Sequence, residues 1–235
     1  VAELRSLGAK HICFKTGPYD PKDLIKIIKI ASKAGVDLIT FDGGGGGTGH
    51  SPSRMMNEWG IPTVYMESML YDIFNKFKEK NLPLPQVAIA GGFTMEDHVY
   101  KGLALGAPYV DFIAIGRGAM AAAFSGNQIG EFILEGKVPK IYQRFGTTKE
   151  EIFSDMRILR EEYGDEVDSI PTGAIGVYSY INRISAGLRQ LMALNRNFHI
   201  KHIDRSDIFP MTDLAAEVSG LPTLKDMLNS ELDLI

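Results

Sequence analysis

The sequence contains a single cysteine, Cys13, and this scarcity excludes an internal disulfide framework. It also excludes any iron–sulfur cluster that is ligated by cysteines from this chain alone, so no such cluster is expected within it. Cys13 stands in a short apolar run, and we expect it to be buried in a strand. The absence of disulfides favours a reducing compartment, which predicts the cytoplasm as the location.

The sequence also lacks a long apolar run, a secretory leader and an excess of basic residues. No apolar run reaches the roughly 18 residues that a membrane span needs, and no basic and then apolar leader opens the chain. With 25 basic and 29 acidic residues the formal net charge is −4. A general nucleic-acid surface needs clustered Lys and Arg, so neither nucleic acid nor membrane is expected as a partner.

Four β-prone segments, each followed by a helical pattern, occupy roughly the first 135 residues. The expected strands are 11–15, 37–42, 86–90 and 111–115. Asp20 before Pro21 is typical of a helix start, and Gly35 is typical of a helix end. Strands that alternate with helices predict an α/β fold with a parallel sheet and right-handed crossovers.

Four strands are half of the eight that close a TIM (β/α)8 barrel. We therefore predict that residues 1–135 form the C-terminal half of such a barrel and that residues 136–235 form a helical extension packing on it. The extension is expected to contain long helices over 149–163 and 173–194. The residues that follow Val1 are typical of the middle of a longer sequence, so we expect further βα units upstream that complete the barrel. The alternative to a half-barrel is an open sheet.

Glycines at the ends of the third and fourth expected strands predict a phosphate site. Gly91 and Gly92, followed by Phe93, end one strand, and Gly116, Arg117 and Gly118 end the next. Glycine permits close backbone approach, and each following helix directs its positive dipole end toward an anion. In barrels the loops after the last two strands frequently hold phosphate, and Arg117 would add a charge.

A glycine run and a lysine at the first two strand ends extend this predicted site. The second strand runs into Asp42, Gly43, Gly44, Gly45, Gly46, Gly47, Thr48 and Gly49. Ordering so many glycines costs much conformational entropy, which favours a ligand loop over a linker at this position. Lys15 ends the first strand, where catalytic groups of barrels lie, and its charge suits the N1–O2 edge of a reduced flavin.

The remaining polar residues give weaker signals. The five histidines show no metal-ligand spacing, so no metal site is predicted. Glu67 and Asp72, on or near the second expected helix, are interpreted as surface groups, although Glu67 is close enough to the helix start to face the barrel mouth.

The order of five motifs resembles the FMN-binding domain of the glutamate synthase family. These motifs are Phe14-Lys15-Thr16, the stretch from Asp42 through Thr48-Gly49-His50-Ser51-Pro52, Gly60-Ile61-Pro62, Gly91-Gly92-Phe93-Thr94 and Leu105-Gly106-Ala107. The resemblance covers about residues 8 to 130. The Gly-Thr-Gly-x-Ser-Pro stretch is its most specific part, because the last two motifs are shared by many FMN barrels.

The resemblance implies an FMN-containing (β/α)8 barrel that reduces 2-iminoglutarate formed from 2-oxoglutarate and ammonia. It implies that Lys15 touches the flavin, that residues 43–49 line flavin and substrate, and that Gly91, Gly92, Gly116 and Arg117 hold the phosphate. The expected substrate is a small amino or keto acid.

The sequence departs from the family in the segment 119–128, which has no cysteine where glutamate synthases supply ligands of a 3Fe–4S cluster. Two alternatives to the FMN-dependent oxidoreductase therefore stay open. One is a barrel enzyme without flavin that binds a phosphorylated metabolite at the same glycines. The other is a half-barrel that self-associates or needs a partner chain, because exposed edge strands invite pairing.

Overall fold

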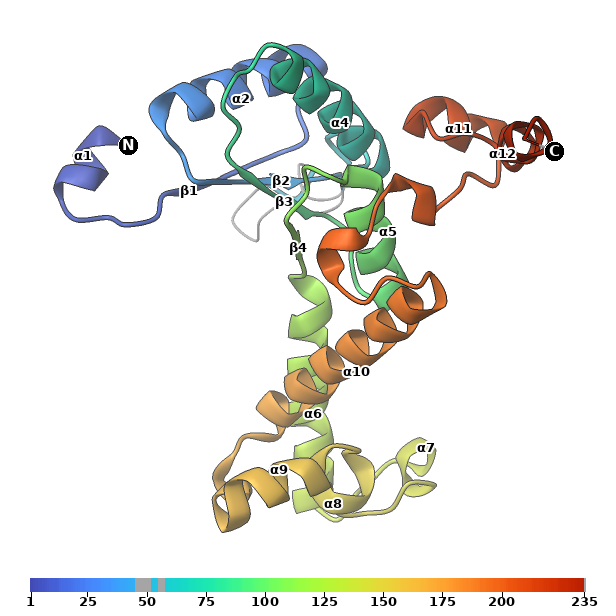
Figure 1. The fold of residues 1–235 in the computed structure, drawn as a ribbon. Coiled ribbons are helices and arrows are strands. Elements are labelled where there is room, and N and C mark those ends of the chain that lie inside the picture. Colours follow the sequence, from blue (N-terminus) through green and yellow to red (C-terminus); the bar gives the residue numbers. More distant parts are fainter. Residues whose placement is uncertain (45–51, 55–57, 235) are drawn as a thin grey trace. The chain divides into compact units, whose positions relative to one another are not determined.

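The computed structural model describes residues 1–44, 52–54 and 58–234 (Figure 1). The chain divides into two compact units. The first comprises Val1–Phe93, Asp97–Ile115 and Leu191–Ile235, and the second comprises Thr94–Glu96 and Gly116–Gln190. The boundary at residue 135 that the sequence suggested stays a prediction.

A four-stranded parallel sheet forms the centre of the first unit, as predicted. Its strands, β1 (Cys13–Thr16), β2 (Leu38–Asp42), β3 (Gln86–Ala90) and β4 (Phe112–Ala114), pair in sequence order. Lys15 is in register with Thr40, which is in register with Ala88 and then Phe112. Because alternate residues of a strand point to opposite faces, this row shares one face of the sheet. The mixed α/β fold with a half-barrel number of strands is confirmed.

Helices α2 (Pro21–Ala34) and α4 (Thr63–Glu79) cover the other face of the sheet (Figure 1). Asp20 caps α2 by accepting from the amides of Lys22 and Asp23, and Gly35 ends it at a φ of 77°. Both helix signals read from the sequence are thus confirmed. The core between helices and sheet is formed by Leu24, Ile28, Ile39, Phe41, Met66, Leu70, Phe74, Val87 and Ile89.

The remaining elements of the first unit are short. They are α1 (Ala2–Ser6), α5 (Glu96–Gly106) from Asp97 onward, η2 (Ile200–His202), η3 (Arg205–Asp207), α11 (Asp213–Ser219) and α12 (Leu224–Leu232). Helix α11 packs against α4, so a C-terminal segment of the chain contacts the helix that follows β2. No helix in the described ranges has both the length and the apolar character that crossing a membrane requires.

The prediction that Cys13 is buried is wrong. Cys13 is exposed, and in β1 only Thr16 is buried. Strand β1 has β2 as its single neighbour within the described sheet, and Phe14 is also 44% exposed. An apolar run at a sheet edge therefore stays open to solvent, which the residue types alone do not reveal.

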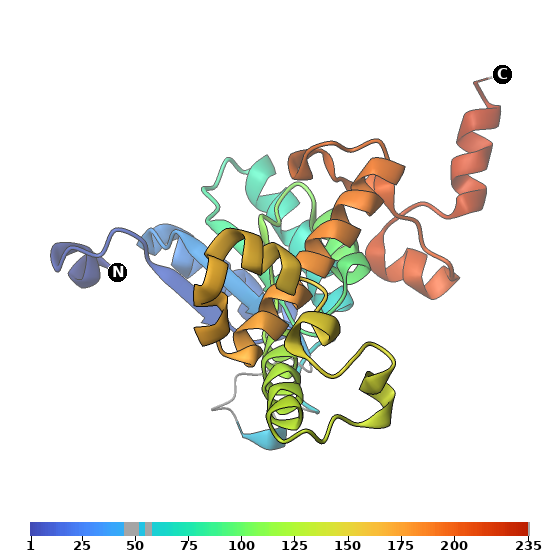
Figure 2. The same cartoon turned by 90° about the horizontal axis from the view of Figure 1, so that it is seen from below.

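The second unit is helical and has its own apolar cluster. It contains α6 (Arg117–Leu134), α7 (Lys140–Gln143), α8 (Lys149–Ile152), α9 (Met156–Tyr163), η1 (Gly164–Ser169) and most of α10 (Thr172–Leu194). Figures 1 and 2 show α9 beside α6 and α10. Met156, Leu159, Val167 and Ile175 are buried there against Ile129 and Ile133 of α6.

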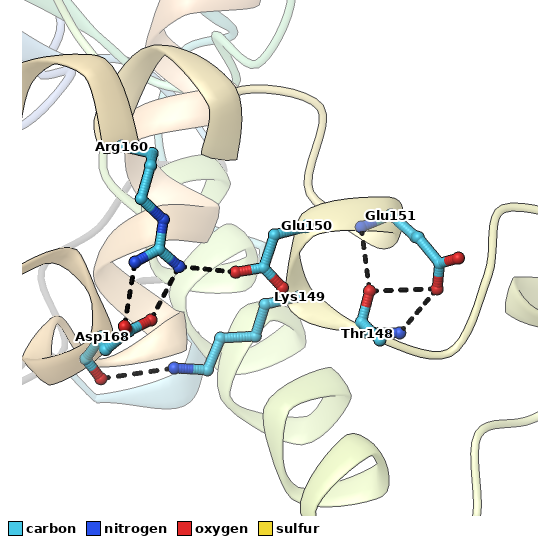
Figure 3. Close-up of polar contacts among 6 residues, drawn as sticks. All are labelled: Thr148, Lys149, Glu150, Glu151, Arg160 and Asp168. Atoms are coloured by element: carbon cyan, nitrogen blue, oxygen red, sulfur yellow. Dashed lines mark hydrogen bonds and ion pairs between the residues drawn. The ribbon is translucent and has the colours of Figure 1, made fainter. Parts of the chain in front are cut away.

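The helix expected over 149–163 is broken into α8 and α9. Phe153 ends α8 in an extended conformation and is buried in the apolar cluster, so the chain turns to place this ring inside. Figure 3 shows how polar contacts hold the two pieces. Arg160 of α9 forms ion pairs of 2.7 Å with Glu150 and 2.8 Å with Asp168, and Thr148 and Glu151 form a capping box.

Candidate functional site at the carboxyl edge of the sheet

Lys15 and Asp42 meet at the carboxyl edge of the sheet. Lys15 lies beside Thr40 in the register, so Asp42, two residues further along β2, points to the same face. Lys15 Nζ lies 2.6 Å from Asp42 Oδ2. The Asp42 side chain is 5% exposed and that of Lys15 is 46% exposed. The pair therefore holds an ammonium group at a fixed place with part of it open to a ligand.

Gly43 and Gly44 are glycines because the chain after β2 packs against the start of α4. The amide of Gly43 donates to the Ala90 carbonyl at 2.8 Å, and that of Gly44 donates to the Ile61 carbonyl at 2.7 Å. A Cβ on Gly43 would lie 2.0 Å from Thr63 Oγ1. A packing role of these two glycines is thus visible, and their predicted ligand role stays a prediction.

Gly91 and Gly92 both adopt positive φ angles, 112° and 87°, that other residues rarely adopt. A Cβ on Gly91 would lie 2.7 Å from Thr63 Oγ1, whereas a Cβ on Gly92 would meet no heavy atom within 4 Å. Thr63 Oγ1 donates to the Gly91 carbonyl at 2.7 Å and fixes this turn. Gly92 is exposed, so its backbone is open to a ligand at the end of β3.

Gly116, Arg117 and Gly118 fall in the second unit, at the beginning of α6. Gly116 is the N-cap residue, so no side chain caps the helix there, and Arg117 is exposed. The first amides of a helix lack intrahelical partners and favour anions. This helix start suits a phosphate, but a phosphate site shared with Gly91 and Gly92 stays a prediction.

Two other groups of predicted site residues have different outcomes. Gly45, Gly46, Gly47, Thr48 and Gly49 lie outside the described residues. The Phe93 ring packs against the sheet–helix core and close to Gly102, where a Cβ would lie 2.6 Å from Phe93 Cε1. This shows a packing role for the ring, and cofactor binding by Phe93 stays a prediction.

A cavity of about 750 Å³ lies beside α4 and α5, and no motif in the sequence predicted it. Gly91 and Gly92 form part of its wall, together with residues of α4, α5, α11 and the segment 207–211. This size falls within the range of about 300–1,000 Å³ that is typical of small-molecule sites.

Glu67 lines this cavity and is 2% exposed, so its interpretation as a surface group is wrong. Burial raises the pKa of Glu67 well above its usual range, and the charge of Arg205 opposes this effect only in part. A signal for burial was present in the sequence. Glu67 lies three residues before Leu70 and seven before Phe74, within the apolar stripe of α4.

Comparison with known proteins decides the family. A family model described as a conserved region in glutamate synthase matches residues 1–125, which is more than half of the 235-residue chain. The chain belongs to the glutamate synthase family. The resemblance seen in the strand-end motifs is thereby confirmed.

Two curated glutamate synthases are similar to part of this family member. The archaeal glutamate synthase (NADPH) of Archaeoglobus fulgidus is 34% identical over 91 residues, and the archaeal-type glutamate synthase (NADPH) of Dehalococcoides mccartyi is 33% identical over 91 residues. Each match covers 38% of this chain and 17% of the relative. The chain therefore corresponds to a small share of the length of these enzymes.

Proposed function

We propose that this glutamate synthase family chain forms part of an FMN-dependent oxidoreductase that acts on a small amino or keto acid. The observation that carries the proposal is the sheet edge. There, the Lys15–Asp42 pair and the positive-φ turn at Gly91 and Gly92 lie at the ends of parallel strands. Ligands of α/β folds bind at the carboxyl ends of such strands.

The residues of the chain fit the parts of FMN by their chemistry. The open backbone of Gly92 suits a phosphate, and so, taken by itself, does the start of α6 with its free amides and the charge of Arg117. The half-exposed ammonium of Lys15 suits the flavin edge that becomes negative on reduction. FMN supplies two-electron transfer when it is bound, while the protein positions it. Asp42 orients Lys15 and offsets part of its charge until a ligand shares the ammonium.

The test uses the full-length protein that contains this chain. We expect purified protein to show the flavin absorbance bands or to take up added FMN. Lys15→Gln should weaken FMN binding about tenfold, which corresponds to about 1.4 kcal/mol. Lys22→Gln is the matched control, because Lys22 is an exposed lysine on α2. NADPH, which stands in the names of both relatives, is the first electron donor to try.

Colourless protein that takes up no FMN would contradict the proposal. If the colourless protein binds a phosphorylated metabolite, and Gly92→Val lowers the affinity for that metabolite, the site is a phosphate site without flavin. The cytoplasmic location remains part of the same proposal and rests on the single cysteine.

We also propose that other sequence completes the barrel, upstream in the same chain, in a second copy or in a partner chain. Within the described sheet, β1 and β4 each pair on one side only, and Phe14 and Phe112 are 44% and 48% exposed. Open edges and exposed aromatic side chains favour pairing. Size-exclusion chromatography of the 235-residue chain should show self-association, and a stable monomer would count against completion by a second copy.

A further inference from the structure

The cavity beside α4 and α5 shares Gly91 and Gly92 with the proposed FMN site, but the rest of its lining has a different chemistry. Three of its lining residues are acidic, Glu67, Asp97 and Asp207, and two can carry a positive charge, His98 and Lys101. Lys101 Nζ already bonds to Asp97 Oδ2 at 2.8 Å. The cavity thus offers acceptor groups, whereas the sheet edge offers the cation of Lys15.

Glu67 is a buried acceptor without a partner at this cavity. Its Oε1 has no hydrogen-bond partner among the residues that the structure describes. Arg205 is the nearby cation that acts on Glu67 electrostatically, but its guanidinium donates to the carbonyls of Leu105 and Ser219 and stacks on Tyr71 at 3.9 Å. Leaving a buried polar group unpaired is unfavourable, so a donor that enters the cavity would stabilise the folded chain.

The other acidic residues of the cavity are already engaged. Asp207 Oδ2 accepts from Asn197 at 2.6 Å and from the amide of Asp204 at 3.0 Å, and Asp97 bonds to Lys101. Glu67 is thus the carboxyl group of the lining with an oxygen still able to accept a hydrogen bond from a ligand.

Apolar side chains form most of the remaining wall. These are chiefly Val64, Phe93, Leu105, Phe209, Met211 and Leu221. A ligand that matches the cavity therefore has an apolar body and one cationic N–H donor.

We propose that this cavity binds a small organic ammonium compound, with the ammonium group bonded to Glu67 and the apolar body against α5 and the segment 207–211. The ammonium supplies the missing donor, and its charge allows Glu67 to be ionised within the cavity. This binding site shares Gly91 and Gly92 with the proposed FMN site, but the ammonium is bonded to Glu67 and its binding does not require flavin.

The test compares three probes of similar shape on the full chain by isothermal titration calorimetry: 4-phenylbutylamine, 4-phenyl-1-butanol and 4-phenylbutyrate. The amine should bind at least about tenfold more tightly than the alcohol, because hydrogen bonds that involve a charged group are stronger than those between neutral groups. The carboxylate should bind most weakly. Equal binding of amine and alcohol, or no binding of the amine, overturns the proposal.

A pair of variants assigns the preference to Glu67. Glu67→Gln keeps the shape and removes the charge, and it should reduce the preference for the amine over the alcohol to less than about twofold. Glu79→Gln is the control, because Glu79 is an exposed carboxylate at the end of the same helix, paired with Lys76. An unchanged preference in Glu67→Gln overturns the assignment. If Glu67→Gln does not fold, the ranking of the three probes on the unsubstituted chain decides. Because no readout involves flavin, failure here is distinct from failure of the FMN proposal.

Discussion

The carboxyl edge of the sheet and the cavity beside α4 each contain a nearly buried carboxyl group, and the two groups differ in their partners. Asp42 Oδ2 makes no hydrogen bond in the described structure, but it forms an ion pair with the ammonium of Lys15 at 2.6 Å. Glu67 Oε1 has no hydrogen-bond partner in the described structure, and burial raises its pKa. At the sheet edge, a preformed ion pair thus positions the cation of Lys15. In the cavity, Glu67 offers an acceptor to which a ligand can donate a hydrogen bond.

The turn at Gly91 and Gly92 should show the largest stability effect at the sheet edge. Gly91→Ala combines a positive φ with a Cβ that would lie 2.7 Å from Thr63 Oγ1 and 2.8 Å from the Gly43 nitrogen. Backbone strain of about 1–2 kcal/mol and overpacking of about 1–3 kcal/mol should lower the free energy of unfolding by about 2–5 kcal/mol. Urea denaturation monitored by circular dichroism gives this value.

Gly92→Ala is the matched control, because Gly92 also has a positive φ but its Cβ would meet no atom within 4 Å. Only the backbone term of about 1–2 kcal/mol should remain. Equal effects of the two substitutions would show that the contact with Thr63 and Gly43 contributes nothing.

The cavity predicts a pH dependence that the sheet edge does not. The pKa of Glu67 is higher in the folded chain than in the unfolded chain, so between the two pKa values the folded state keeps a proton that the unfolded state releases. The contribution of Glu67 to the free energy of unfolding is therefore fully favourable below about pH 4.3. It falls as pH rises to the folded pKa, by at most about 1.4 kcal/mol per pH unit.

Glu67→Gln should remove this fall, so its stability relative to the unsubstituted chain should improve from pH 4.5 to 7. Denaturation at several pH values measures the difference, with Glu79→Gln as the comparison. A difference that stays constant with pH would mean that Glu67 ionises normally in the folded chain.

The smallest effect is expected at the Lys15–Asp42 pair. Asp42→Asn removes the charge partner of Lys15, but Lys15 is 46% exposed and remains solvated, so the free energy of unfolding should fall by about 1 kcal/mol. Lys15→Met in the same background should add little to this loss, because the pair is already broken. A double-mutant cycle by urea denaturation tests this, and fully additive effects would mean that the pair contributes nothing.

Helix-capping and strand patterns in the sequence predicted most helices and strands, because these patterns depend only on residues close together in the chain. Asp20 with Pro21 and the αL glycine Gly35 fixed the limits of α2 by capping chemistry. The parallel sheet followed from the alternation of strand and helix patterns. The single helix expected over 149–163 was wrong, because the burial of Phe153 in the apolar cluster outweighs helical propensity there.

The sequence by itself determined the order of the βα units, the lysine and the glycines at the strand ends, and through them the family. Tertiary structure alone decided how those residues are used. Pairing of β1 with β2 places Lys15 against Asp42, and packing of Gly43 and Gly91 on Thr63 explains why a side chain is excluded there. Exposure of Cys13 and burial of Glu67 also depend on which neighbours the fold supplies. Burial and ion pairing arise from groups distant in the chain, and residue types alone do not specify those distances.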